Sequence, residues 1–380
     1  MTIYLDHAAT TPLASEAWAV MRAHLAPGAE HANAASDHAP GARAAEAVAA
    51  ARAQVAALIG ARPDEIVFTS GATEADNLAL KGSLDYLGGG HVVTTRIEHK
   101  AVLDVAQHLE TLGTPVTRVA PGADGRVTAE AVAAAMRPDT ALVSVMWVNN
   151  ETGAVNPVPE IARLCAERAV RFHTDAAQAA GRVPIDVGAV PVSLLSLSAH
   201  KCYGPQGIGA LYVRRRPRAR VTPQQHGGGH EQGMRSGTLP THQIAGFGAA
   251  AALAAARVDA DAAHARALAD RLRAGLAPLP GLLVNGDPAV CVPHIVNIGF
   301  DRVHGEALRA ATAELAVASG SACSAAAAES SYVLRALGRD DRQAGAALRI
   351  STGRDTTLAQ IDRAVAVIGE AVTRLRAIAA

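Results

Sequence analysis

Short apolar runs alternate with longer alanine-rich stretches over the first two thirds of the chain. Residues 73–81, 101–112 and 159–168 repeat apolar side chains at helical spacing, and they lie between short runs rich in β-branched residues. Strands that alternate with helices predict right-handed crossovers and a mostly parallel sheet, so the expected fold class is α/β. The predicted strands are residues 65–69, 91–95, 141–148, 170–174, 193–197 and 209–213.

The pattern changes after about residue 256. A long helical stretch at 259–276 leads into short strands and helices, and a segment of Gly, Ser and Ala follows at about 318–331. We therefore expect a large domain, residues 13–257, whose central sheet is flanked by helices. A smaller α+β domain would consist of residues 1–12 and 258–380. Its predicted strands are residues 282–285, 294–299 and 347–351, and its other helices are residues 305–312 and 358–378.

Composition narrows the class of protein. The chain has 380 residues, 49% of them hydrophobic and 18% charged, with a formal net charge of zero, which is typical of a globular enzyme and favours neither nucleic acid nor a membrane as partner. The basic run at 214–220 is interpreted as a solvated loop. Four widely spaced cysteines without a CxxC pair argue against disulfides and a zinc site. With no secretory signal or membrane span visible, we expect a cytoplasmic protein without a metal.

Polar residues gather where the predicted strands end. The stretch TSGATE, residues 69–74, follows one strand and opens a helix, where free N–H groups and the Thr73 hydroxyl suit a phosphate, although a plain helix cap would use the same residues. Asp175 ends another strand and can approach a flat ligand, or cap a helix. His99 and Asn150 follow two further strands, and a glycine-rich loop with two histidines lies at 226–238.

Lys201 follows an apolar strand and precedes the turn Gly204-Pro205. A lysine buried at such a place is costly unless its amino group is used. Together with the phosphate site, the acid, the histidine and the amides, it completes the set of groups that pyridoxal 5′-phosphate requires. Such a site needs a lysine for the Schiff base, an acid for the pyridinium nitrogen, a phosphate cradle and a cover for the ring.

The ordered motifs resemble the pyridoxal-phosphate cysteine desulfurases of the class V aminotransferase group, and in particular the housekeeping, iron–sulfur-cluster type. The resemblance covers nearly the whole chain, from YLDHAATTP through SGATEADN, EHKAVLD, VNNETG, HTDAAQ and SAHKCYGPQG to HGGGHEQGMRSGTLP, ASGSAC and LRISTGR. It implies the fold type I architecture of pyridoxal-phosphate enzymes, a homodimer, L-cysteine as substrate, and protein sulfur acceptors such as a cluster scaffold protein.

The resemblance also implies roles for individual residues. Lys201 would form the Schiff base, Asp175 would pair with the pyridine nitrogen, and His99 would stack on the ring and act in acid–base steps. Cys323 would be the nucleophile that accepts sulfur. Gln178 would bind the ring hydroxyl, and the phosphate would be bound by Ala72, Thr73, Ser198, His200 and, from the second subunit, Thr238. Asn150 would bind both the cofactor and the substrate carboxylate, and Arg349 would bind that carboxylate. Asn33 would lie near the substrate.

The expected reaction converts L-cysteine to L-alanine and leaves the sulfur as a persulfide on Cys323, for transfer to iron–sulfur cluster, thio-cofactor or tRNA assembly. Cys165 and Cys291 are interpreted as buried apolar residues, and Cys202 as a minor rival nucleophile. Two other classes stay open at this point: an aminotransferase of the same fold, and a non-enzymatic protein that binds a phosphorylated ligand. Selenocysteine lyase activity is a close variant of the expected reaction.

Overall fold

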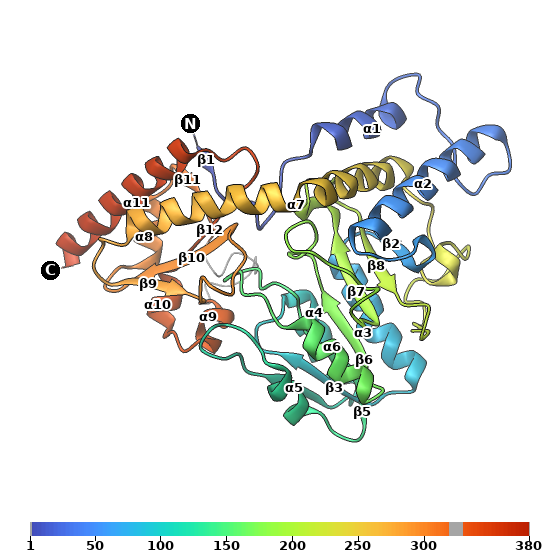
Figure 1. Cartoon of the computed structure of the whole chain (residues 1–380), viewed down its shortest axis with the longest axis horizontal. Helices are drawn as coiled ribbons and strands as arrows, with labels where there is room; N and C mark the ends of the chain where they lie inside the picture. The colour runs from blue at the N-terminus through green and yellow to red at the C-terminus, as the bar shows by residue number, and fades with distance from the viewer. Residues whose placement is uncertain (1, 319–329, 380) are drawn as a thin grey trace.

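The computed structural model describes residues 2–318 and 330–379 (Figure 1). Its largest sheet within those residues has seven strands in the order β2-β8-β7-β6-β5-β3-β4. Strand β8 runs antiparallel to its neighbours β2 and β7, and the other pairs are parallel, which confirms the α/β class with a mostly parallel sheet. The strands are β2 (Ile66–Thr69), β3 (His91–Thr95), β4 (Val116–Val119), β5 (Thr140–Ser144), β6 (Arg171–Asp175), β7 (Leu194–Ser198) and β8 (Gly209–Val213).

Side chains alternate between two buried faces of this sheet, as strand geometry requires. Val67, Leu142 and Leu194 pack with helices α3 (Ala72–Leu87) and α4 (Lys100–Thr111). Their neighbours Phe68 and Val143 pack on the opposite face, against α2 (Ala39–Leu58), α6 (Val158–Glu167) and the first half of α7 (Thr241–Leu276). Helices cover both faces of the sheet, so side chains on both faces are apolar and the strands appear in the sequence as continuous apolar runs.

A second, smaller region contains an antiparallel sheet of β9 (Leu282–Asn285), β10 (Ile295–Phe300) and β12 (Leu348–Ser351) in the order β12-β10-β9. The chain's first strand, β1 (Ile3–Tyr4), pairs there with β11 (Leu315–Ala316). Helices α8 (Gly305–Ala311) and α11 (Leu358–Ala379) cover its apolar cluster together with the second half of α7. Figure 1 shows both chain ends in this region.

Helix α7 runs across both regions in Figure 1 and begins at Thr241, well before the predicted start at residue 259. Glycines at 246 and 248 weaken a helix prediction, yet here they permit close packing, since a Cβ on Gly248 would lie 2.5 Å from Ala51 Cα. Ile244 and Phe247 belong to the cluster under the large sheet, and Leu268 belongs to the cluster of the small region. The division into domains at residues 257 and 258 stays a prediction.

Strand β5 ends at Ser144, although apolar residues continue to Val148 and predicted a longer strand. Beyond Ser144 the backbone still bonds to β6, through Val145 N to His173 O at 3.1 Å and Trp147 N to Asp175 O at 2.9 Å, but the Met146 N–H donates to the Glu98 carboxylate at 3.0 Å instead of to a neighbouring strand. No described helix is long and apolar enough to cross a membrane. The remaining elements are α1 (Ser15–Leu25), α5 (Ala129–Ala135), α9 (Tyr332–Ala336), α10 (Asp341–Gly345) and the 3-10 turns Pro63–Glu65, Ala199–Lys201 and Glu231–Gly233.

Candidate active site

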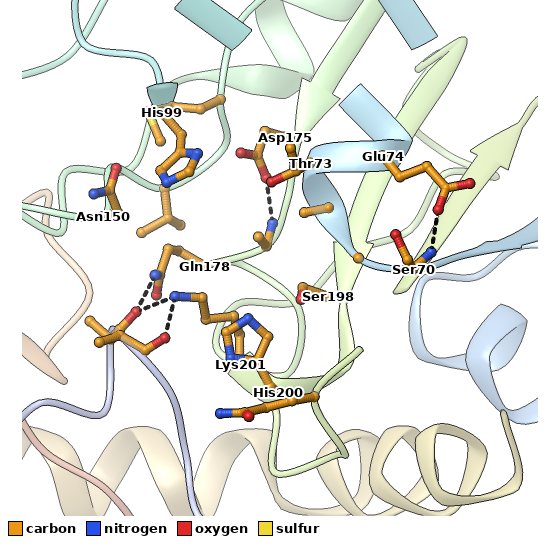
Figure 2. A pocket seen from close by; sticks show the side chains of 18 of the residues that line it. Ser70, Thr73, Glu74, His99, Asn150, Asp175, Gln178, Ser198, His200 and Lys201 are labelled. Atoms are coloured by element: carbon orange, nitrogen blue, oxygen red, sulfur yellow. Dashed lines mark hydrogen bonds between the residues drawn. The ribbon is translucent and has the colours of Figure 1, made fainter. Parts of the chain in front are cut away.

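A cavity of about 550 Å³ opens where the parallel strands β6 and β7 end, as expected for a ligand site in such a sheet (Figure 2). Strand β6 ends in Asp175, β7 ends in Ser198, and the residues after β3 and β5 bring His99 and Asn150 to the same edge. Ten of the residues predicted from sequence line this cavity: Ala72, Thr73, His99, Asn150, Asp175, Gln178, Ser198, His200, Lys201 and Arg349.

Lys201 ends the short 3-10 turn that follows β7, and its amino group points into the cavity. Nζ donates to the backbone carbonyls of Ala8 and Ala9 at 2.6 and 2.7 Å. The side chain is half-buried, which corrects the expectation of a buried lysine. Carbonyl oxygens stabilise the ammonium form, because they accept hydrogen bonds from a cation that has lost part of its water. The N-terminal segment therefore holds the amino group at the cavity wall.

Asp175 is buried, and its Oδ1 accepts a hydrogen bond from the Ala177 N–H at 2.8 Å. Burial raises the pKa of this carboxyl above its usual range, while His99, the Ala177 N–H and Lys201 oppose the rise. A carboxylate that keeps a backbone donor and a nearby ammonium group, here that of Lys201, can remain ionised in a site that excludes water. Asp175 thus presents a negative charge to the cavity floor.

His99 caps the N-terminus of α4, where its Nδ1 accepts the Ala101 N–H at 3.1 Å. The neutral ring therefore carries its proton on Nε2. Burial lowers the pKa of His99, and Lys201 lowers it further, whereas Asp175 acts in the opposite direction. The result is a neutral imidazole on the cavity wall that can donate through Nε2. Gln178 is fixed as well, because its Nε2 donates to Ala8 O at 2.7 Å.

The N-terminus of α3 forms an anion cradle. Its N-cap residue, Gly71, supplies no side-chain cap, and among the described residues nothing lies within 4 Å of the position that a Gly71 Cβ would take. The first amides of the helix therefore face open space in the cavity, together with Thr73 and Ser198. This geometry fits a phosphate group. His200 also lines the cradle, and burial followed by the nearby Lys201 lowers its pKa to about 4.

Glu74, a residue for which the sequence predicted no role, lies beside this cradle. Its carboxylate accepts the Ser70 N–H at 2.6 Å and pairs with Arg235 at 2.7 Å (Figure 2). Burial alone would raise the pKa of Glu74, but the bonds from Arg235 and Ser70 lower it overall. Its charge is therefore balanced by the loop that carries Arg235, so the cradle remains suited to an anion.

Arg349, on β12 of the small region, contributes its side chain to the cavity wall. Its Nη1 donates to Asn150 O at 2.9 Å and its Nη2 pairs with Asp6 at 2.8 Å. Within the described residues, Arg349 Nε and Asn150 Oδ1 are buried without a hydrogen-bond partner. Buried polar atoms without partners are costly, so these two indicate where a ligand completes the structure. A guanidinium and an amide together suit a substrate carboxylate.

Three of the predicted residues do not line the cavity. Asn33 is exposed, and its Oδ1 accepts the Ala35 N–H at 2.9 Å. Thr238 is exposed in the glycine-rich loop. Cys323 lies outside the described residues. Sequence reasoning also missed Asp6 and the carbonyls of Ala8 and Ala9, although the segment YLDHAATTP that holds them had been noted as a family motif.

The other cysteines are poor nucleophiles. Cys165 and Cys202 are buried, and Cys291 is partly buried. Burial raises the pKa of Cys202 to about 11 and that of Cys165 to about 12, so little thiolate forms at neutral pH. Among the described residues, no group of three or more His, Cys, Asp or Glu side chains could hold a metal ion.

Comparison with known proteins gives a consistent result. The family model described as aminotransferase class-V matches residues 3–364. The curated protein "Cysteine desulfurase IscS" of Vibrio campbellii is 52% identical over 379 residues, which covers 99% of this chain and 94% of that protein. A solved structure titled "NIFS-LIKE PROTEIN" has a TM-score of 0.91 at 31% identity and covers 99% of this chain and 100% of that one. Another, "SspA in complex with cysteine", has a TM-score of 0.82 at 36% identity and covers 94% and 100%.

Proposed function

The chain belongs to the cysteine desulfurases of the class-V aminotransferase family, and we propose that it converts L-cysteine to L-alanine and passes the sulfur through Cys323 to acceptor proteins. The observation that carries this proposal is the shared cavity of Lys201, Asp175 and Arg349, which combines an amino group, a buried acid and a carboxylate anchor. The acceptors would serve the assembly of iron–sulfur clusters, thio-cofactors or modified tRNA.

The cavity fits pyridoxal 5′-phosphate. Lys201 would hold it covalently, Asp175 would face the ring nitrogen, Gln178 the ring hydroxyl and His99 the ring face. The phosphate would lie at the start of α3, on the amides of Ala72 and Thr73 and the side chains of Thr73, Ser198 and His200. Asn150 would also contact the cofactor. When bound, this group withdraws electrons from the substrate α-carbon and so loosens the bonds around it.

The chain's own residues then orient the substrate and move its atoms. Arg349 binds the carboxylate of L-cysteine through its buried Nε–H, which has no partner among the described residues, and Asn150 donates to it through its side-chain amide N–H groups. The Cys323 thiolate attacks the substrate sulfur and forms an S–S bond. The substrate's C–S bond breaks, its electron pair stays with the carbon, and protonation of that carbon yields alanine. The Nε2–H of His99 would donate a proton toward the reacting groups, since Nδ1 accepts the Ala101 N–H.

Residues on both sides of the Cys323 segment support its role. Ala318 N donates to the Arg349 carbonyl at 3.2 Å, and Arg349 N donates to the Ala318 carbonyl at 2.7 Å. On the other side, Ser331 Oγ donates to the buried carboxyl of Glu151 at 2.5 Å, next to Asn150. Both ends of the segment are thus bonded to the part of the chain that would hold the substrate carboxylate.

We propose that the active form is a homodimer. Thr238 is exposed in the loop after Glu231, and that loop is held in place because Glu231 pairs with Arg52 at 2.6 Å and accepts the Phe68 N–H at 2.7 Å. A firmly anchored loop with an exposed hydroxyl suits a contact with the phosphate of a second subunit. Analytical ultracentrifugation combined with activity at the same dilution tests this. A monomer with full activity would exclude it.

The decisive experiment measures products from L-cysteine with the cofactor-loaded protein. We expect equal amounts of alanine and enzyme-bound sulfur in the first turnover, and continued alanine and sulfide release when a thiol reductant is present. An aminotransferase would instead form a keto acid and leave the cofactor in its amine form. A protein that only binds a phosphorylated ligand would release neither product.

A further inference from the structure

A cluster of buried polar side chains lies next to Asp175 on one face of the seven-stranded sheet. Asp175 and His173 are two residues apart on β6, so their side chains lie on the same face of the sheet. On the neighbouring strands, Ser144 and Ser196 lie on that face too, because each is two residues beyond a leucine that packs against α3. Asp76 comes from α3 itself.

His173 joins three strands through its two ring nitrogens. Nδ1 lies 2.8 Å from Ser144 Oγ on β5, and Nε2 lies 3.0 Å from Ser196 Oγ on β7. Ser196 is also the register partner of Asp175, and His173 is that of Ser144. One fully buried imidazole therefore ties the end of β5 to the middle of β7 from its own place on β6, two residues before the acid.

Asp76 is fully buried beside this imidazole, with its Oδ1 3.5 Å from His173 Nε2. Within the described residues, neither carboxyl oxygen of Asp76 has a well-aligned hydrogen-bond partner, although the Ser196 hydroxyl lies close enough to lower its pKa. A buried carboxylate without donors is very costly, and so is an imidazolium at this depth. Burial raises the pKa of Asp76 well above its usual range, with Asp175 and Glu98 adding to the rise and Ser196 opposing it, and burial lowers the pKa of His173 to about 3.

Three acids share this interior: Asp76 on α3, Glu98 after β3 and Asp175 on β6. Burial raises the pKa of Glu98 to about 8, partly offset by the Met146 N–H and Thr95, and Asp175 raises it further. Asp175 also accepts a backbone N–H, from Ala177, and it differs from the other two acids because His99 and Lys201 lie near it and lower its pKa. A single negative charge is therefore best placed on Asp175.

We propose that His173 is a positioning residue for Asp175, and that Asp76 lies beside it as an uncharged acid, so that the negative charge of this interior remains on Asp175. The proposal rests on the proposed function, in which Asp175 faces the ring nitrogen of the cofactor. Neither residue lines the cavity, so both act through Asp175.

His91 offers a matched control. It is also fully buried, and its ring nitrogens lie 2.8 Å from Thr140 Oγ1 and 2.9 Å from Thr117 Oγ1 at the opposite end of the sheet. His173→Leu and His91→Leu each remove one imidazole held by two hydroxyls. We expect a loss of thermal stability from both, because each removes two hydrogen bonds between a buried ring and hydroxyl groups.

The two variants should differ once the cofactor is loaded. His173→Leu should weaken cofactor binding about tenfold and shift the pH midpoint of the visible absorbance of the lysine-bound cofactor by about 0.5 unit or more, because the side chains that tie β6, the strand of Asp175, to β5 and β7 are lost. His91→Leu should leave both quantities within about twofold and 0.1 unit of wild type. A folded His173→Leu protein with wild-type affinity and midpoint would overturn the proposal.

If His173→Leu does not fold, the double variant Ser144→Ala/Ser196→Ala tests the same contacts more gently, with Thr117→Val as its control. We expect the double variant to shift the absorbance midpoint in the direction of weaker ring-nitrogen pairing, and Thr117→Val to leave it in place. An unchanged midpoint in the folded double variant also overturns the proposal. If the wild-type protein itself forms no lysine-bound chromophore, the proposed function is wrong. That outcome differs from an unchanged midpoint in a folded variant, which contradicts only the role proposed here for His173.

The uncharged state of Asp76 has a readout that needs no cofactor. A buried acid with a raised pKa loses stability as pH rises above its unfolded value, and Asp76→Asn removes that loss. The unfolding equilibrium constant of the apoprotein relative to that of Asp76→Asn should grow up to about tenfold per pH unit between pH 5 and 7. A ratio that stays constant over this range would show that Asp76 is ionised in the fold, and would overturn this part of the proposal.

Discussion

The two sheets of this protein contribute to the site in different ways. The seven-stranded sheet brings Asp175, Ser198 and Lys201 to one edge, because parallel strands all end there and turn away. In the antiparallel three-stranded sheet polar side chains bond to other protein groups, as Asn285 does when it donates to Asn297 at 2.8 Å and Asn297 does when it donates to the Glu151 carbonyl at 3.1 Å. Its contribution to the cavity is Arg349 on β12.

This difference suggests a division of labour. Groups that must change protonation or form covalent bonds belong to the parallel edge, where backbone ends and open space leave their reactive atoms accessible. The small sheet holds one permanent cation at a fixed place, bonded to Asn150 and Asp6. Substitutions at the parallel edge should therefore reduce kcat or abolish the reaction, whereas substitutions around Arg349 should act on KM.

The largest effect is expected from Lys201→Ala. The chain has three lysines, Lys81, Lys100 and Lys201, and of these the described cavity wall includes Lys201. The variant should lose borohydride-trapped cofactor and all measurable alanine release, since no other amino group is placed to replace it. Lys81→Ala and Lys100→Ala should retain both. Trapped cofactor that maps to Lys100 by mass spectrometry would refute the assignment.

Cys323→Ala should also stop turnover, but at a later point. Cofactor binding and its absorbance should remain as in wild type, because Lys201, Asp175 and the phosphate cradle are unchanged. The persulfide found by mass spectrometry after brief exposure to cysteine should disappear, together with alanine release.

Cys202→Ala is the matched control for that experiment. Cys202 is buried, its Sγ donates to Ala199 O at 3.3 Å, and burial raises its pKa to about 11. We expect persulfide formation and alanine release within about twofold of wild type, because a protonated, enclosed thiol does not attack the substrate. Sulfur that maps to Cys202 would reverse the roles of the two cysteines.

The contrast between the sheets also explains what could be predicted from sequence. The strand β6 and the acid that ends it, Asp175, follow from a short β-branched run and a polar residue after it. The position of Lys201 in the site can be predicted in the same way, because the end of a parallel strand is a local feature of the sequence. These inferences needed neighbouring residues in the chain and no knowledge of distant contacts.

Long-range contacts could not be predicted in this way. Asp6 reaches Arg349 across nearly the whole chain, and the carbonyls of Ala8 and Ala9, which follow β1, meet Lys201 about 190 residues later in the sequence. The local pattern predicts a shorter helix than α7, because Gly246 packs against Met21 of α1 and Gly248 packs against Ala51 of α2, two partners that the local pattern does not reveal. The half-buried state of Lys201 depends on the same distant segment.

Arg349→Gln tests the small sheet directly. The buried Nε of Arg349 has no hydrogen-bond partner among the described residues, and a substrate carboxylate would accept its hydrogen bond. Losing a charge-assisted hydrogen bond costs about 1.5–3 kcal/mol, so KM for cysteine should rise roughly 10- to 150-fold. We expect kcat to fall much less, because the groups at the parallel edge are unaffected. A fall in kcat with unchanged KM would contradict the division of labour.

The smallest effect is expected from Asp6→Asn. Asp6 holds Arg349 Nη2 at 2.8 Å with a side chain that is 23% exposed, so its charge opposes the arriving substrate carboxylate. Arg349 stays in place without it, because Nη1 still donates to Asn150 O. A partly exposed ion pair contributes about 0.2–1 kcal/mol, which predicts a KM lowered about 1.5- to 5-fold with kcat unchanged. Glu314→Gln, which removes the exposed pair with Arg363 in the same region, is the control and should leave KM unchanged. A higher KM for Asp6→Asn would instead mean that Asp6 orients Arg349, and the small sheet would then need two residues, rather than one cation, to anchor the substrate.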